Sequence, residues 1–135
     1  MPKPPLPPRL QEVLAKPNPA VIGSVSPDGS PNTVATWYVW DNGRVLISMD
    51  EGRRRLEYLR REPRVSLTVL DGAEWYRHIT LHGRSTLHDD ADLSDIDRIS
   101  AHYTGRPYSQ RERGRVSAWI EVESWHAWNS GRRWT

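Results

Sequence analysis

The segment TVATWYVWDNGRVLISM, residues 33–49, decides the fold class of this chain. Its first half, Thr33–Trp40, is rich in β-branched and aromatic residues, which favour strands. Its second half, Arg44–Met49, is again mostly apolar, and the residues DNG stand between the two halves. An Asn-Gly pair between apolar runs is a strong hairpin signal, because both residues tolerate the positive φ angles of a tight turn. The segment therefore predicts two antiparallel strands.

Strand patterns continue on both sides of this hairpin. Ala20–Ser26 precedes it across the turn residues Pro27–Ser30, and Arg64–Leu70 follows it with strict apolar and polar alternation. Further strands are predicted over Tyr76–Leu87 and Arg115–Glu123. Consecutive strands with turn-sized gaps favour an antiparallel barrel over a parallel α/β fold.

Three helices are predicted around these strands. The first covers Pro8–Ala15 and the last covers Asp92–Tyr103. The middle helix, Glu51–Glu62, is expected to begin after an N-cap at Asp50 and to stop at Pro63. The order α-β-β-β-α-β-β-α-β predicts a mainly β (α+β) barrel with short flanking helices.

The 135 residues suffice for one domain. We expect a Pro-rich arm over residues 1–7, a barrel domain over residues 8–128 and a C-terminal tail over residues 129–135. The chain has no cysteine, which excludes disulfides, thiolate catalysis and Cys-based metal sites. The arm lacks the apolar stretch of a signal peptide, and no run is long enough to span a membrane. These features favour a cytoplasmic protein without a membrane partner.

Arginines gather where the middle helix is predicted to begin, although the net charge of the chain is only +2. The helix dipole already places positive charge at a helix N-terminus, so cations there are unfavourable. The position of Arg53 and Arg55 is explained if a bound anion neutralises them. Phosphate is a candidate for this anion, because helix N-termini bind phosphate. The alternative is a solvated helix whose arginines pair with Glu51, Glu57 and Glu62.

Four segments carry a resemblance to a known family. AVIGSVSPDGSPNTVATWYVW (residues 20–40), SMDEGRRRLEYLRREPRVSLTV (48–69) and YRHITLHGRSTLHDD (76–90) resemble, in this order, the pyridoxamine 5′-phosphate oxidase-like split β-barrel superfamily. ISAHYTGRPYSQRERGRVSAWIEVE (99–123) is closer still to its branch of oxidoreductases that use the deazaflavin coenzyme F420. The resemblance covers residues 8–123.

This resemblance implies a split β-barrel of the FMN-binding type that forms a homodimer with two cofactor sites at the interface. It implies that Arg53 and Arg55 hold the cofactor phosphate, and that Trp75 and Tyr76 lie where the partner subunit closes the pocket. The strand residues that it places along or beside the isoalloxazine-like ring are Asn32, Val34, Ala35, Thr36, Ile47 and Ser48. The chain departs from the family pattern at Arg55, where Lys is common, and at Tyr58, where Asn often stands.

The implied reaction is hydride transfer between coenzyme F420 and a small conjugated or unsaturated substrate. An FMN-dependent oxidase or reductase is the alternative, and so is a cofactor-binding module without turnover. The chemistry would belong to the cofactor, so no catalytic residue is assigned. Arg111 and Arg113 are candidates to meet the acidic tail of F420, but as loop residues they are also expected to be solvated.

Metal or haem binding and nucleic-acid binding are two other classes of function, and the sequence supports them less. His78 and His82 share one face of a strand, yet a metal or haem site would need further ligands, so no metal is assigned. Tryptophans interleaved with arginines can stack the bases of single-stranded nucleic acid. A net charge of +2 is small for such a binder, so no nucleic-acid partner is predicted.

Overall fold

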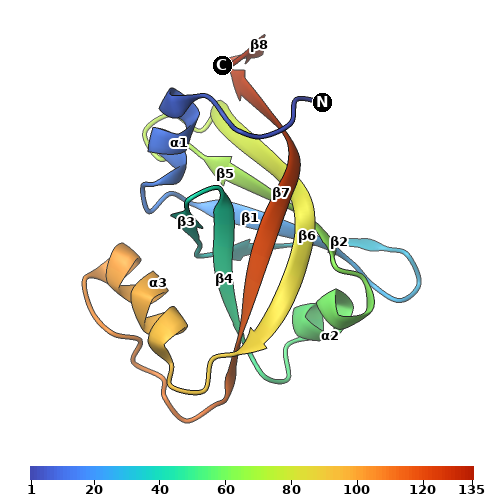
Figure 1. Cartoon of the computed structure of the whole chain (residues 1–135), viewed down its shortest axis with the longest axis vertical. Helices are drawn as coiled ribbons and strands as arrows, with labels where there is room; N and C mark the ends of the chain where they lie inside the picture. Colours follow the sequence, from blue (N-terminus) through green and yellow to red (C-terminus); the bar gives the residue numbers. More distant parts are fainter.

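One antiparallel sheet of eight strands, flanked by three helices, makes up the computed structural model, which describes residues 1–135 (Figure 1). In chain order the elements are α1 (Pro8–Leu14), β1 (Ala20–Val25), β2 (Pro31–Thr36), β3 (Val39–Asp41), β4 (Arg44–Asp50), α2 (Arg54–Arg61), β5 (Arg64–Leu70), β6 (Arg77–Asp89), α3 (Ser94–Thr104), β7 (Arg115–Asn129) and β8 (Arg132–Arg133). The predicted mainly β class is confirmed. None of the helices is long and apolar enough to cross a lipid bilayer.

The strands follow the order β2-β1-β5-β6-β7-β4-β3, and β8 pairs with β7. The long strands β6 and β7 run through the middle of the sheet, while α2 and α3 lie at the end of the molecule away from the two termini (Figure 1). The edge strands β2 and β3 are separated by only Trp37 and Tyr38, yet they do not pair with each other. The barrel is therefore split between its two edges.

The core lies inside the curved sheet and is sealed at one end by both termini. The predicted alternation in β5 is confirmed, since Val65, Leu67 and Val69 are buried. Leu10 of α1 is fully buried, as is its neighbour Leu14. The backbone N–H of Trp125 donates to the Pro2 carbonyl at 3.0 Å, and that of Trp134 donates to Ala127 at 2.9 Å. The N-terminal arm and the C-terminal tail thus pack against the barrel.

The strand predicted over Thr33–Trp40 is wrong in one respect, because it is broken into β2 and β3. The cause is Tyr38, which is fully buried in the core. Its hydroxyl donates to the carbonyl of Leu14 at 2.8 Å, at the end of α1. Trp37 stays on the outer side, so the chain passes from one edge of the sheet to the other at this pair.

The predicted start of the middle helix is also wrong. Gly52, with φ of +90°, turns the chain, and α2 begins only at Arg54. Asp50 is the last residue of β4 rather than an N-cap, and the residue at the N-cap position, Arg53, makes no side-chain capping bond. The last predicted strand is too short, because β7 continues to Asn129 and includes Trp125 and Trp128.

A bulge in β7, where Glu123 has no partner in β6, fixes where the two long strands change register. The shift lies between His82 and Gly83, and Gly83 then pairs with Val122 of β7. A Cβ atom at Gly83 would overlap the backbone carbonyl group of Glu121. This close approach of two backbones requires glycine.

Replacing Gly83 by alanine tests this requirement. We expect Gly83→Ala to lower the free energy of unfolding by about 2–4 kcal/mol, because the strand backbone must move to admit a methyl group. Gly23→Ala in β1 is the matched control, since its Cβ would closely approach only the Ser66 hydroxyl, at 2.7 Å, which can rotate away. Urea titrations give both values. Equal losses at the two glycines would contradict the role of backbone crowding.

Candidate functional site

Two adjoining cavities lie between β2, the end of β4, α2 and α3. Their volumes are about 590 Å³ and about 580 Å³. Both are lined by Ala35, Ser48, Tyr108 and Arg115, so together they form one trough. The two ends of this trough differ in chemistry, one being rich in arginine and the other in aromatic side chains.

The arginine end is built by the outer face of β2 and the first turn of α2. Only one of its lining residues, Asp50, is acidic. The others are mostly cationic, polar or small: Ser24, Asn32, Thr33, Val34, Ala35, Ser48, Met49, Gly52, Arg53, Arg54, Arg55, Tyr58, Tyr108 and Arg115. Because α2 has no side-chain cap at its N-terminus, the helix dipole adds to the positive potential at this end.

Arg55 is the side chain with the least satisfied charge in the trough. Its Nη2 donates to the Ser48 carbonyl at 3.4 Å, but Nε and Nη1 are buried without any partner. Burial, together with the positive charges of Arg53 and Arg115 and against the opposing charge of Asp50, lowers the pKa of Arg55 to about 10. A buried guanidinium without a counter-ion is unfavourable. An anion in this cavity would satisfy it.

Asp50 neutralises only part of this charge. Its carboxylate lies 3.0 Å from Arg115 Nη1, and the same carboxylate lies 3.6 Å from both Arg53 Nε and Arg113 Nη1. Arg115, whose side chain is only 8% exposed, also donates from Nε to Ser48 Oγ at 3.1 Å. One carboxylate among these arginines leaves a net positive charge around Arg55.

The aromatic end is uncharged apart from Arg115. Trp37 stacks on Tyr103, with ring centroids 5.2 Å apart and planes 11° apart. The Tyr103 hydroxyl donates to the Asn18 carbonyl at 2.7 Å, and burial raises its pKa to about 12. The remaining lining residues of this end are Pro17, Pro19, Ala20, Ala35, Thr36, Ser48, Ile96, Ile99 and Tyr108. This end therefore suits a flat, neutral group.

Most residues predicted from the sequence meet in the trough. Asn32, Val34, Ala35, Ser48, Arg53 and Arg55 line the arginine end, and Thr36 lines the aromatic end. Ile47 does not, because its side chain is fully buried in the barrel core. Trp75 and Tyr76 stack on each other at 4.2 Å in the exposed loop before β6 and line neither cavity of this protomer.

Other residues line the trough although the sequence does not predict them as site residues. The sequence predicts Asp50 as a helix cap and Arg115 as the first residue of a strand. The two face each other across β4 and β7, a register that neither segment reveals by itself. Trp37, Tyr103 and Tyr108 come together only because the strand breaks after Thr36 and α3 packs beside β4. Arg111 is bound to Asp97 at 2.8 Å, so the acidic-tail contact considered for it is not supported.

The histidines considered for a metal lie elsewhere. The rings of His82 and His126 face each other on the outer side of β6 and β7, 5.6 Å apart. Burial, helped by the neighbouring charges of His82 and His78, lowers the pKa of His126. No group of three or more His, Asp or Glu side chains is arranged to hold a metal ion.

Fold and trough together define the class of protein. An antiparallel sheet whose edge strands β2 and β3 meet without pairing, flanked by short helices, is a split β-barrel. The sequence pattern of the family described as pyridoxamine 5′-phosphate oxidase matches residues 6–129. The chain belongs to this oxidoreductase family.

Solved structures share this fold. An F420 reductase has a TM-score of 0.82 at 20% identity, covering 89% of this chain and 98% of that one. A conserved hypothetical protein from Mycobacterium tuberculosis has a TM-score of 0.76 at 20% identity, covering 95% and 87%. HupZ from Group A Streptococcus has a TM-score of 0.70 at 13% identity, covering 97% and 100%. These likenesses confirm the predicted fold. No curated protein matches the sequence.

The unsatisfied guanidinium of Arg55 has a measurable consequence for the ligand-free protein. We expect Arg55→Met to raise the melting temperature, because methionine fills the same space without a buried, unpaired charge. Arg60→Met is the control on the same helix, since Arg60 is exposed and paired with Glu57. Differential scanning calorimetry without added ligand measures both. A lower melting temperature for Arg55→Met would mean that Arg55 stabilises the empty protein.

Proposed function

We propose that the trough binds coenzyme F420, and that the protein uses it to reduce a small conjugated or unsaturated substrate. The observation that carries this proposal is the guanidinium of Arg55 at an uncapped helix start, whose buried Nε and Nη1 have no partner. A phosphate group would supply the missing acceptor atoms, and the adjoining neutral end would accept a ring system. The likeness to an F420 reductase supports the same choice.

Each part of the trough has a distinct task in this proposal. Arg55, Arg53 and the first N–H groups of α2 hold the phosphate, while the residues of β2 from Asn32 to Thr36 lie along the ligand from the arginine end to the aromatic end. F420, when bound, would supply the hydride, because it is a two-electron carrier. Trp37 and Tyr103 exclude water beside the ring and offer a flat surface to the substrate. The further positive charge of Arg54, which lines the same end, and of Arg113, which lies beside Asp50, suits the acidic tail of F420 better than it suits FMN.

We further propose that the protein works as a homodimer. In β2, four of the six residues are exposed and the other two are half-buried, although it is one wall of the trough. Val34 is 44% exposed and Trp37 is 39% exposed. Trp75 and Tyr76 are more exposed still, at 61% and 58%. Exposed apolar side chains of this size mark interaction surfaces, so a second copy would cover β2 and bring its own loop to the trough.

Cofactor titration tests the proposed function. We expect F420 to bind with a dissociation constant in the micromolar range or below, and FMN to bind more weakly, as followed by cofactor fluorescence. Removing both phosphate contacts in Arg53→Ala/Arg55→Ala should weaken F420 binding by more than about 100-fold, since each contact contributes about 1.5–3 kcal/mol.

Arg60→Ala/Arg61→Ala is the matched control, because it removes two exposed arginines from the other end of α2. A preference for FMN would assign the protein to the FMN-dependent alternative with the same site. Unchanged F420 affinity in Arg53→Ala/Arg55→Ala would place the phosphate elsewhere. Binding of neither cofactor would refute the proposal.

Mixed dimers test the contribution of the partner subunit. Neither Arg53→Ala/Arg55→Ala nor Trp75→Ala/Tyr76→Ala should bind F420 tightly when alone. A heterodimer of the two carries one site with all four wild-type side chains, so we expect tight binding at one site of each pair. Two affinity tags allow the heterodimer to be purified and titrated. Absence of any recovery would show that Trp75 and Tyr76 do not act across the interface.

A further inference from the structure

The segment between α3 and β7, residues 105–114, runs beside the trough and contributes Tyr108 to its lining. Nine of its ten residues are exposed, and Tyr108 is the exception. The Tyr108 ring lines both cavities and lies under the Arg115 guanidinium, whose Cζ is 4.8 Å from the ring centroid. The ring also meets the edge of Trp37 at 6.5 Å. Tyr108 is thus the one side chain by which this segment forms the wall of the trough.

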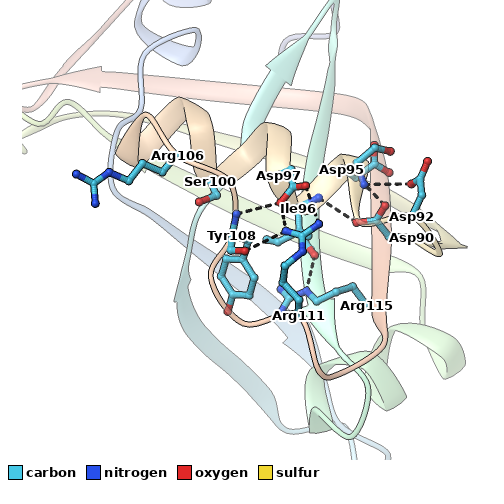
Figure 2. Close-up of polar contacts among 12 residues, drawn as sticks. Asp90, Asp92, Asp95, Ile96, Asp97, Ser100, Arg106, Tyr108, Arg111 and Arg115 are labelled. Atoms are coloured by element: carbon cyan, nitrogen blue, oxygen red, sulfur yellow. Dashed lines mark hydrogen bonds and ion pairs between the residues drawn. The ribbon is translucent and has the colours of Figure 1, made fainter.

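The backbone of Tyr108 is held by a polar clamp (Figure 2). Asp97 of α3 accepts hydrogen bonds from the Tyr108 backbone N–H at 2.9 Å and from both Nη atoms of Arg111 at 2.8 and 3.1 Å. Arg111 Nη1 also donates to the Tyr108 carbonyl at 3.0 Å. Asp97 and Arg111 therefore hold Tyr108 by both its N–H and its C=O.

This clamp is stronger than an ordinary exposed ion pair. Such pairs stabilise little on their own, because solvent screens them and two long side chains must be ordered. Here the pair is bidentate, and each partner also binds the same residue of the segment 105–114. The Arg111 guanidinium and the Tyr108 N–H lower the pKa of Asp97, so the carboxylate stays charged at neutral pH.

We infer that Asp97 is a positioning residue for the trough, which acts by holding Tyr108 as the wall common to both ends. The part of this inference that concerns ligand affinity rests on the proposed function. Without the clamp, the segment is held at its far end by the Glu51 N–H bond to the Gly114 carbonyl and by the Arg113–Asp50 pair, and Tyr108 itself only by the contacts of its ring with Arg115 and Trp37. Tyr108 would then leave its place beside Arg115, and a bound ring would lose one side of its cavity.

The chain offers a matched comparison on the same helix. Arg98 of α3 pairs with Asp41 at 2.9 Å, with exposure similar to that of the Asp97–Arg111 pair. The Asp41–Arg98 pair lines neither end of the trough. Asp41→Ala thus removes from α3 an ion pair of similar exposure, without changing a contact of residues 105–114. Alanine at position 97 suits the helix, so Asp97→Ala is expected to fold.

Two measurements on the full-length protein test the inference. Trypsin can cut the segment after Arg111 and Arg113, and mass spectrometry gives the rate at these bonds. We expect Asp97→Ala to be cut about tenfold faster than wild type, and Asp41→Ala at the wild-type rate. The dissociation constant of F420 should rise about 5- to 20-fold in Asp97→Ala. Tyr108→Ala should show the same rise, with no further loss in the double variant.

Equal cleavage of Asp97→Ala and wild type would overturn the inference, and so would an equal loss of affinity in Asp41→Ala. Additive losses in Asp97→Ala/Tyr108→Ala would also overturn it, because Asp97 would then act by another route. If the wild-type protein binds neither F420 nor FMN, the proposed function fails. The clamp is then judged on cleavage alone, where faster cutting of Asp97→Ala supports it and equal cutting refutes it.

Discussion

The carboxylate of Asp50, buried among arginines, is the interaction on which the trough depends. Asp50 ends β4 and Arg115 begins β7, and the two are direct partners in the ladder. Their ion pair allows Arg115 to be buried at the meeting point of the two cavities. A buried pair of this kind gives little net stability but is costly to break, so it specifies a geometry more than it strengthens a fold. The same carboxylate is too small a counter-charge for Arg55.

Much of the fold follows from local sequence signals. The Asn-Gly turn, the alternation in Arg64–Leu70 and the prolines at helix ends each act over a few residues, so the sequence predicts them. The late start of α2 depends on the positive φ of Gly52, whereas the early break after Thr36 depends on contacts across the molecule. Tyr38 is drawn inward by a hydrogen bond to Leu14, 24 residues earlier in the chain. No window along the sequence contains that information.

The candidate site, like the fold, was predictable from the sequence only in part. Arg53 and Arg55 were predictable as anion-binding residues. Cations at a helix N-terminus are unfavourable with respect to the helix dipole unless an anion neutralises them. Tyr108 and Arg115 were not predictable, because their roles arise from the path of residues 105–114 and from the register of β7 against β4. Trp75 and Tyr76 were proposed from family resemblance. Their exposed stack fits a surface that meets another molecule, and one protomer alone gives them no partner in the trough.

The two ends of the trough are encoded by different stretches of the chain. The cationic end comes mainly from β2, β4 and the start of α2, whereas four residues of the aromatic end, Ile96, Ile99, Tyr103 and Tyr108, come from α3 and the segment after it. Strands β2 and β4 are held in the sheet by backbone ladders, but the later stretch is joined to it mainly by side chains. An evolving lineage can therefore change which neutral molecule it accepts by altering a single short helix and its loop. The cationic end would be inherited unchanged through such a change.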